Sequence, residues 1–263
     1  MKNAIDTTFD FTSDTPHYWD NFWQNCDGLG CGSADPDTKS PTLRKYHKIL
    51  WSKSLPNGEF LELKEGKTTN EYLRWKDFVF GSDSIINIYL HNIRLKAFIE
   101  KVKIEIEKTQ NYKVFLENYL KTAYTIGGCM IFPKRERDNS INCQRGINRV
   151  IQDRFDLTLE CIRRYYTRDS NSPLTNVFSK NSQFFDLFID FKGFVNFFLL
   201  QDLVAEDYSE IKLLLQNNLA FTEDPRPQTV EEWFILYNNQ MNFLAKRNER
   251  ISKIRFDHEN CIK

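Results

Sequence analysis

The sequence predicts an α+β fold in which N-terminal antiparallel strands pack on a predominantly helical C-terminal part. Residues 45–90 alternate apolar and polar side chains between turn signals, which is the period-two pattern of half-buried strands. After His91 the apolar residues recur every three or four positions, as they do on one face of a helix. The chain has 263 residues, of which 41% are hydrophobic and 14% aromatic, so it can bury a sizeable core.

Two regions are predicted along the chain. Residues 1–44 form an N-terminal arm and loop, and residues 45–263 form a single α+β domain. The arm carries the aromatic runs "FDF" and "YWDNFW", followed by a stretch rich in glycine, aspartate and proline that prevents regular structure. We expect Trp19, Phe22 and Trp23 to be at least partly buried, because exposed apolar surface costs about 25 cal/mol per Å².

The strands are expected mainly within residues 45–90 and 124–133. The tripeptide Pro56-Asn57-Gly58 predicts a hairpin turn, because Asn and Gly both tolerate a positive φ. The run "TIGGCMIFPK" is too short and too rich in glycine at its start for a helix, so it is interpreted as a central strand.

The glycine pair at the start of that run admits two interpretations. A phosphate-binding loop has its glycines after a strand and before a helix, whereas Gly127 and Gly128 precede the strand that Pro133 ends. A close approach of two backbone segments is therefore favoured over a nucleotide-binding fingerprint.

Helices are predicted for most of the remaining chain. Two apolar faces follow His91, with the spacing of helical residues; they consist of Leu95, Phe98, Ile99, Val102 and Ile106, then Tyr112, Phe115, Leu116 and Tyr119. The long final helix opens with Thr229 and Glu232, which form a capping box by satisfying each other's free backbone N–H groups.

The charge balance excludes some classes of partner. Lys plus Arg and Asp plus Glu both number 36, so no global field attracts bulk nucleic acid or an anionic membrane. No window reaches the roughly 18 apolar residues of a spanning helix, and the N-terminus lacks the apolar run of a signal peptide. We therefore expect a cytoplasmic protein with no membrane contact.

Six cysteines are too few and too scattered for a disulfide scaffold, and we expect reduced thiols. Cys26 and Cys31 are the one close pair, but a pair without a second Cys or His pair nearby is a weak zinc signal. No metal site is predicted, and no motif identifies a cofactor.

The stretch with the most unusual charge pattern runs from Gly146 to Tyr166 and is predicted to be one helix. One face of this helix would carry charge at every turn, from residues Arg149, Asp153, Asp156, Glu160 and Arg163. The stripe is either a solvated face laced with weak ion pairs or the lining of a polar cleft. In a cleft, two like charges one turn apart would raise one carboxyl's pKa and suit it to acid–base chemistry.

The cleft hypothesis supplies the candidate site residues. The catalytic candidates are His47, Asp156 and Glu160, since His exchanges protons near neutral pH and paired carboxylates serve as acid and base. The ligand-binding candidates are of two kinds. Arginines offer guanidinium forks for phosphate, namely Arg44, Arg145, Arg149 and Arg163. Ser82 and Asp83 offer a hydroxyl and a carboxyl group from the segment "GSDS", whose alternative interpretation is a turn at the end of a strand.

Several long runs of the chain resemble a widespread bacterial family of conserved proteins with no assigned function. The resemblance extends from about Asp10 to Ile251 and is carried by runs such as "DPDTKSPTLRKYHKILWSKSLPNG", "YTIGGCMIFP", "INCQRGINRVIQDRFDLTLECIRRYY" and "FFDLFIDFKGFVNFFLLQDLV". It implies a bacterial or prophage source, a single-domain unit and a cytoplasmic location, and it implies no reaction.

Two functions fit the sequence. The first is an enzyme that binds a nucleotide or another phosphorylated small molecule between the N-terminal strands and the charged helix. Its activity could be ADP-ribosyltransferase-like or nucleotide-processing, with a role in phage defence. The second is a non-enzymatic interaction module whose aromatic arm docks on a partner protein or on a second copy of the chain, forming a homodimer.

Overall fold

The protein combines one antiparallel sheet with many helices, and this confirms the predicted α+β class. A computed structural model describes residues 5–24, 35–67, 71–90, 95–134, 141–142, 145 and 150–254. Within these residues the sheet has four strands in the order β1-β2-β3-β4, namely β1 (Lys64–Glu65), β2 (Leu73–Trp75), β3 (Phe78–Ser84) and β4 (Cys129–Pro133). The longest pairing joins β3 to β4, from Phe80 opposite Pro133 to Ser84 opposite Cys129.

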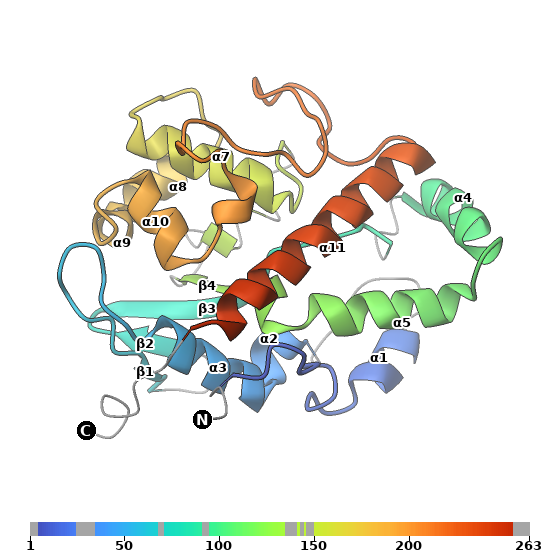
Figure 1. The fold of residues 1–263 in the computed structure, drawn as a ribbon, viewed down its shortest axis with the longest axis horizontal. Helices are drawn as coiled ribbons and strands as arrows, with labels where there is room; N and C mark the ends of the chain where they lie inside the picture. The colour runs from blue at the N-terminus through green and yellow to red at the C-terminus, as the bar shows by residue number, and fades with distance from the viewer. Residues whose placement is uncertain are drawn as a thin grey trace.

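The helices surround the sheet on several sides (Figure 1). Their bounds are α1 (Tyr18–Gln24), α2 (Pro36–Lys39), α3 (Pro41–Trp51), α4 (Lys96–Glu107), α5 (Tyr112–Ala123), η3 (Ile126–Gly128), α7 (Phe155–Tyr166), α8 (Thr175–Lys180), α9 (Ser182–Asp186), α10 (Phe191–Phe197), η4 (Gln201–Leu203) and α11 (Val230–Ser252). Helix α11 crosses the molecule diagonally, with α4 and α5 on one side of it and α7 to α10 on the other (Figure 1).

The first segment predicted to be a strand is a helix. Residues 41–51 form α3, which Ser40 caps by accepting a hydrogen bond from the Leu43 N–H, with Pro41 at the first helical position. Pro suits that position because its missing N–H would be unpaired there in any case. The buried residues of α3 lie three and four apart and are Leu43, Tyr46, His47, Leu50 and Trp51, so the alternation predicted from residue 45 onwards was wrong for this segment.

The charged helix is shorter than predicted. Helix α7 begins at Phe155 rather than at Gly146, and residues 146–149 lie outside the described part of the chain. Gln152 and Asp153 have φ values of 37° and 59°, which are left-handed and incompatible with a continuing helix. Asp153 is therefore displaced from the face that Asp156 and Glu160 share.

The strand after the glycine pair was predicted to be central in the sheet. It lies instead at one edge of the described sheet. All five residues of β4 are nevertheless buried. The expected close backbone approach is confirmed at Gly128, whereas the tight contact at Gly127 is with a side chain. A Cβ on Gly128 would lie 1.8 Å from the Ala123 carbonyl oxygen, and one on Gly127 would lie 2.5 Å from Asn248 Oδ1.

Helix α11 begins as predicted and joins several elements. Thr229 Oγ1 accepts from the Glu232 N–H at 3.1 Å and Glu232 Oε2 accepts from the Thr229 N–H at 3.2 Å, so the capping box is confirmed. Further along, the fully buried Arg247 donates to the carbonyl oxygens of Gly127, Cys129 and Phe198. None of the described helices is both long and apolar enough to cross a membrane.

The N-terminal aromatic residues pack against their own chain. Trp19, Phe22 and Trp23 are partly buried against the core, which confirms the prediction made from their cost in water. Trp23 Nε1 donates to Glu117 of α5 at 3.2 Å, and the Tyr18 ring meets the Tyr124 ring edge to face at 5.9 Å. Helix α1 thus packs against α5, with Lys113 over the Trp23 ring and Lys121 over the Trp19 ring.

Gly128→Ala is expected to destabilise the protein by about 3 kcal/mol, because the new Cβ would displace a backbone carbonyl in a filled core. The matched control is Gly58→Ala in the exposed turn, where φ is +89° and nothing lies within 4 Å of an added Cβ. That change tests backbone strain alone and should cost about 1 kcal/mol. Urea denaturation of both variants makes the comparison, and equal losses would show that the close approach is unimportant.

Candidate functional site

The two carboxylates of the charged helix are buried, and each has arginine partners. Asp156 is 0% exposed and forms a bidentate pair with Arg154, with N–O distances of 2.8 and 2.6 Å. The same guanidinium donates to the carbonyl oxygens of Leu215 and Pro225, while Asp156 accepts from the Leu214 N–H. This network attaches the segment before α11 to the start of α7.

Glu160 repeats this arrangement one turn later. It accepts from Arg163 at 2.7 and 2.9 Å and from Arg164 at 2.7 Å, and it is 1% exposed. Arg164 also donates to the carbonyl oxygens of Leu219 and Asn171. The solvated-face interpretation is thus excluded for both carboxylates, since both are buried and their charges are balanced by arginines. Two of these arginines, Arg154 and Arg164, also join α7 to two loops.

Neither Asp156 nor Glu160 lines the two cavities described below. Their predicted catalytic role, and the ligand-binding role of Arg163, remain predictions, and Arg163 also lines neither of these cavities. His47 is likewise fully buried, with Nδ1 3.2 Å from the Tyr72 hydroxyl. Burial, helped by the nearby Arg247 charge, lowers the pKa of His47 to about 3, so the imidazole is neutral at physiological pH.

The remaining predicted residues fall into two groups. Arg44 lies over the Tyr72 ring at 4.9 Å and 3.7 Å from Glu65, and Arg149 lies outside the described residues. Ser82, Asp83 and Arg145, in contrast, meet at one place. Arg145 forms an ion pair with Asp83 and donates to the Ser84 carbonyl oxygen at 2.5 Å.

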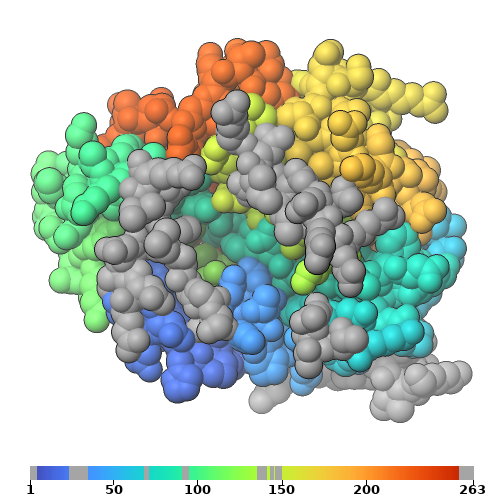
Figure 2. Space-filling model, turned by 180° about the vertical axis from the view of Figure 1, so that it is seen from behind, coloured from blue at the N-terminus to red at the C-terminus, as the bar shows by residue number. Residues whose placement is uncertain are grey.

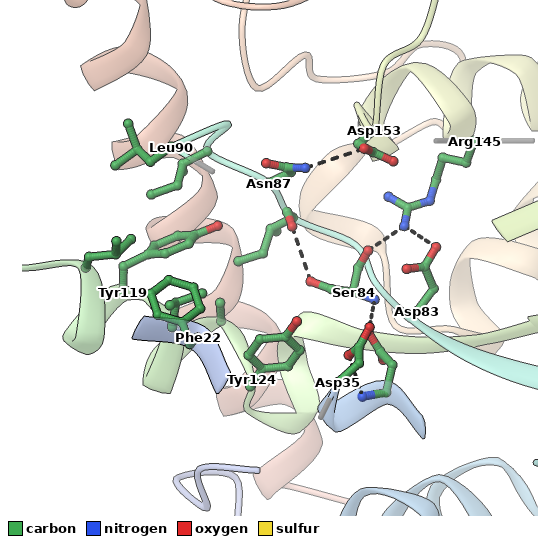
Figure 3. Close-up of a pocket in the computed structure, with 16 residues that line it drawn as sticks. Phe22, Asp35, Asp83, Ser84, Asn87, Leu90, Tyr119, Tyr124, Arg145 and Asp153 are labelled. Carbon is green, nitrogen blue, oxygen red and sulfur yellow. Dashed lines mark hydrogen bonds and ion pairs between the residues drawn. The ribbon is translucent and has the colours of Figure 1, made fainter. Parts of the chain in front are cut away.

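Asp83 and Arg145 stand at the polar end of a cavity of about 170 Å³ (Figure 3), and Ser82 contacts Asp37, which also lines it. Asp35 and Asp37 come from the start of α2, Asp83 from the end of β3, and Asp153 from the turn before α7. Arg145 is the one cationic residue that lines it within the described chain. Four carboxyl groups therefore face one guanidinium.

The opposite end of the cavity is apolar and aromatic. Figure 3 shows Phe22, Tyr119 and Leu90 across the cavity from Arg145. The wall on this side comes from α1, from α5 and from the chain after β3, and its members also include Ile86, Ile88, Leu116, Leu120, Ala123 and Tyr124. Seen from behind, the N-terminal segments (blue), the chain after β3 (teal) and the α4–α5 pair (green) come together on one face (Figure 2).

Burial, with the neighbouring carboxylates as a smaller cause, raises the pKa values of carboxyl groups in this cavity. Burial, together with the neighbouring Asp35 and Asp83 carboxylates, raises the pKa of Asp37 well above its usual range. Burial also raises the pKa of Asp83 to about 6, although the adjacent Arg145 acts in the opposite direction. A carboxyl group with a pKa near 6 can both donate and accept a proton at neutral pH.

Local structure fixes the polar end. Asp35 is the N-cap of α2 and accepts from the Asp37 N–H at 3.0 Å. Asp37 then accepts from the Ser82 hydroxyl at 2.5 Å and from the Ser84 N–H at 3.0 Å, which holds α2 against β3. Asn87 donates to Asp153 at 3.4 Å across the cavity rim.

Helix α11 fixes the middle of the cavity wall. Trp233 Nε1 donates to the Ile88 carbonyl oxygen at 2.7 Å, and Gln240 Nε2 donates to the Asn87 carbonyl oxygen at 3.0 Å. Both donors come from the buried face of α11. The wall that carries Asn87 is consequently set by a helix more than 140 residues later in the chain.

The sequence analysis named Asp83, Arg145 and Ser82 as candidates, which remain predictions, and did not name Asp35 or Asp37. The missed pair lies in "DPDTKSP", which was interpreted as irregular because of its Asp and Pro content. An Asp followed by Pro is also the signature of an N-cap and a first helical residue, and that signal was available. No local pattern indicated that Asp153, Asn87 and Phe22 would join them.

A second cavity of about 160 Å³ lies between α7 and the chain that follows it. It is lined by the buried Cys161 thiol, by Tyr165 and by residues of the segment 168–178. Burial raises the pKa of Cys161 to about 12, so the thiol is not ionised and is a weak nucleophile. Among the described residues, no three Asp, Glu, His or Cys side chains are arranged to hold a metal ion; Cys26 and Cys31 lie outside them.

The chain belongs to a family of unknown function, DUF6994, whose sequence profile matches residues 5–251. This agrees with the resemblance to a conserved family that has no assigned function. No curated protein and no solved structure matches the chain.

Replacing both buried carboxylates of α7, Asp156→Asn with Glu160→Gln, is expected to destabilise the protein by roughly 3–5 kcal/mol, because it leaves buried guanidinium groups without a counter-charge. The control is Glu249→Gln, which removes an ion pair to Lys253 whose side chains are 63% and 71% exposed. That change should cost less than about 1 kcal/mol. Unfolding in urea measures both, and a double variant as stable as the control would contradict the structural role.

The first cavity is called the acidic cavity because Asp35, Asp37, Asp83 and Asp153 line it. Its carboxyl groups predict a specific dependence of stability on pH. Because the pKa of Asp83 is raised in the folded protein, the native state binds this proton more tightly than the unfolded chain. The resulting stabilisation is present at low pH and is lost as pH rises through about 6. Asp35 and Asp37, whose pKa values are also raised, act in the same direction.

We therefore expect Asp83→Asn to flatten the fall in unfolding free energy between about pH 4 and pH 7 without abolishing it. Urea melts across this range test the slope rather than the absolute stability, which also changes when Arg145 loses its partner. A slope identical to that of the unchanged protein would refute the assignment. Glu249→Gln should keep the original slope.

Proposed function

We propose that the protein is an enzyme that binds a nucleoside-type small molecule in the acidic cavity, with one ring of the ligand inside. The observation that carries the proposal is the cavity itself, in which Asp35, Asp37 and Asp83 converge opposite an aromatic wall. Ligand sites are typically concave, largely apolar and equipped with a few convergent polar groups. Carboxyl groups with raised pKa values in such a place favour a functional role over a structural one.

The size and charge of the cavity narrow the ligand. A dry cavity of about 150 Å³ accommodates benzene, so a volume of about 170 Å³ takes one six-membered ring and not a whole nucleotide. A phosphate group would be repelled by the carboxylates. Arg145 and Arg163 are engaged by Asp83 and Glu160, so neither forms a free anion cradle. The phosphates of a nucleotide ligand would therefore remain outside the cavity.

Asp83 is the proposed acid–base residue. It lines the cavity, its side chain is 28% exposed, and its pKa of about 6 is suited to proton transfer at neutral pH. Arg145 orients the carboxyl group, and Asp35 and Asn87 offer further hydrogen bonds to the ligand. An ADP-ribosyl transfer or another nucleotide-processing step would use such a group; these specific reactions and the role in phage defence remain predictions.

The alternative function, an interaction module with a docking arm, has less support. The aromatic residues of α1 that would dock on a partner already pack against α5. Phe22 also contributes to the cavity wall. The arm is thus used within the chain, and homodimer formation remains a prediction that no observation in the fold favours.

Thermal melts with a panel of nucleosides test the proposal. At a ligand concentration 100-fold above Kd, binding adds about 2.7 kcal/mol, which corresponds to a rise in Tm of several degrees for a chain of this size. We expect such a rise for the unchanged protein and for Glu249→Gln, and its loss in Asp83→Asn. The absence of a shift with every nucleoside, in a protein that melts cooperatively, would refute the proposed function.

A further inference from the structure

Among the residues that the structure describes, the acidic cavity contains more negative charge than Arg145 balances. Asp35, Asp83 and Asp153 line it together with Asp37, whose pKa burial raises well above its usual range, and Arg145 is the cationic side chain opposite them. Like charges this close destabilise the fold unless a proton or a cation lies between them. Asp37 accepts hydrogen bonds from the Ser82 hydroxyl and the Ser84 N–H, and its raised pKa favours the protonated form. Asp83, with a pKa of about 6, is mostly ionised at neutral pH.

A second, independent feature of the cavity calls for a hydrogen-bond acceptor. The Arg145 side chain is 3% exposed and lines the cavity, and its Nη2 donates to Asp83 and to the Ser84 carbonyl oxygen. The other terminal nitrogen, Nη1, makes neither of these bonds, and Figure 3 shows it on the side of the guanidinium that faces Asn87 and Asp153. An incoming group with an acceptor would pair with this donor. Figure 3 shows the guanidinium directed at the cluster of Asp83, Ser84 and Asp153.

The aromatic wall of the cavity is the third feature that limits which chemical group can bind there. Phe22, Tyr119 and Tyr124 line the end of the cavity away from Arg145. A flat cationic ring suits such a wall, because aromatic faces carry partial negative charge and attract cations. A hydrated metal ion does not suit it, and the described residues offer no arrangement of three metal-binding side chains.

We propose that the moiety bound in the acidic cavity is an organic cation of one-ring size that carries a hydrogen-bond acceptor. Its charge lies among Asp35, Asp83 and Asp153, its acceptor faces Arg145, and its ring contacts Phe22 and Tyr119. This inference rests on the proposed function, since it specifies which ring of the nucleoside-type ligand enters the cavity. A pyridinium carboxamide is the simplest chemical group that combines these three properties.

Three small probes separate the requirements without any change to the protein. The N-methylnicotinamide cation has both the charge and the carboxamide acceptor, neutral nicotinamide has only the acceptor, and N-methylpyridinium has only the charge. Isothermal titration calorimetry at neutral pH and low salt measures all three. We expect the first probe to bind roughly tenfold more tightly than either of the others, a ratio that corresponds to about 1.4 kcal/mol.

Two variants assign the preference to particular residues. Asp35→Asn keeps an acceptor for the Asp37 N–H and removes one negative charge, so it should reduce the preference for the cation over nicotinamide. Arg145→Lys keeps a positive charge beside Asp83 but loses the guanidinium fork, so it should reduce the advantage of the carboxamide. Glu249→Gln should change neither ratio.

The outcomes distinguish this inference from the proposed function. Equal affinity for the cation and for nicotinamide would overturn the inference, as would binding of nucleosides with no binding of any single-ring probe; in both cases the nucleoside site would stand. Failure of all nucleosides and all three probes would overturn both. Tight binding of the cation probe that survives in both variants would place the ligand elsewhere and also overturn the inference.

Discussion

The fold depends most on one buried cation, Arg247 of α11. Its guanidinium is 0% exposed and donates to backbone carbonyls at Gly127, Cys129 and Phe198. These three carbonyls belong to the turn before β4, to β4 itself and to the end of α10, so one side chain joins the sheet, the glycine turn and the C-terminal helices to α11. Carbonyl oxygens buried without a donor are costly, and the arginine satisfies all three. Burial keeps the neighbouring His47 neutral by lowering its pKa, and the Arg247 charge acts in the same direction.

Helix α11 transmits this constraint to the candidate site. Trp233 and Gln240 hold the carbonyls of Ile88 and Asn87 in place, and Asn248 accepts from the Gly127 N–H. The wall of the acidic cavity is therefore attached to the same helix that organises the core. A site built on such a scaffold is rigid, and rigidity is what allows several carboxyl groups to be kept close together despite their repulsion.

The charged residues of this chain serve two different purposes, which their burial alone does not distinguish. In α7 each carboxylate has an arginine in contact, and both Arg154 and Arg164 also bind loop carbonyls, so the charge is neutralised and used for packing. In the described part of the acidic cavity several carboxyl groups share Arg145 next to open space, and burial, with the neighbouring carboxylates as a smaller cause, raises the pKa values of Asp37 and Asp83. Incomplete neutralisation beside a cavity, rather than charge density along a helix, therefore marks the candidate site.

The sequence by itself determined the elements whose signals are local. The faces of α4 and α5, the capping box of α11 and the tight approach at Gly128 follow from residue spacing and from the absence of a side chain, and the structure confirms them. Local alternation misassigned α3, because its helical signal, Ser40 before Pro41, competes with a pattern that also fits a strand. Only the tertiary structure decided the cavity. Its carboxyl groups come from α2, β3 and the turn before α7, and their approach depends on long-range hydrogen bonds that leave no periodic trace in the sequence.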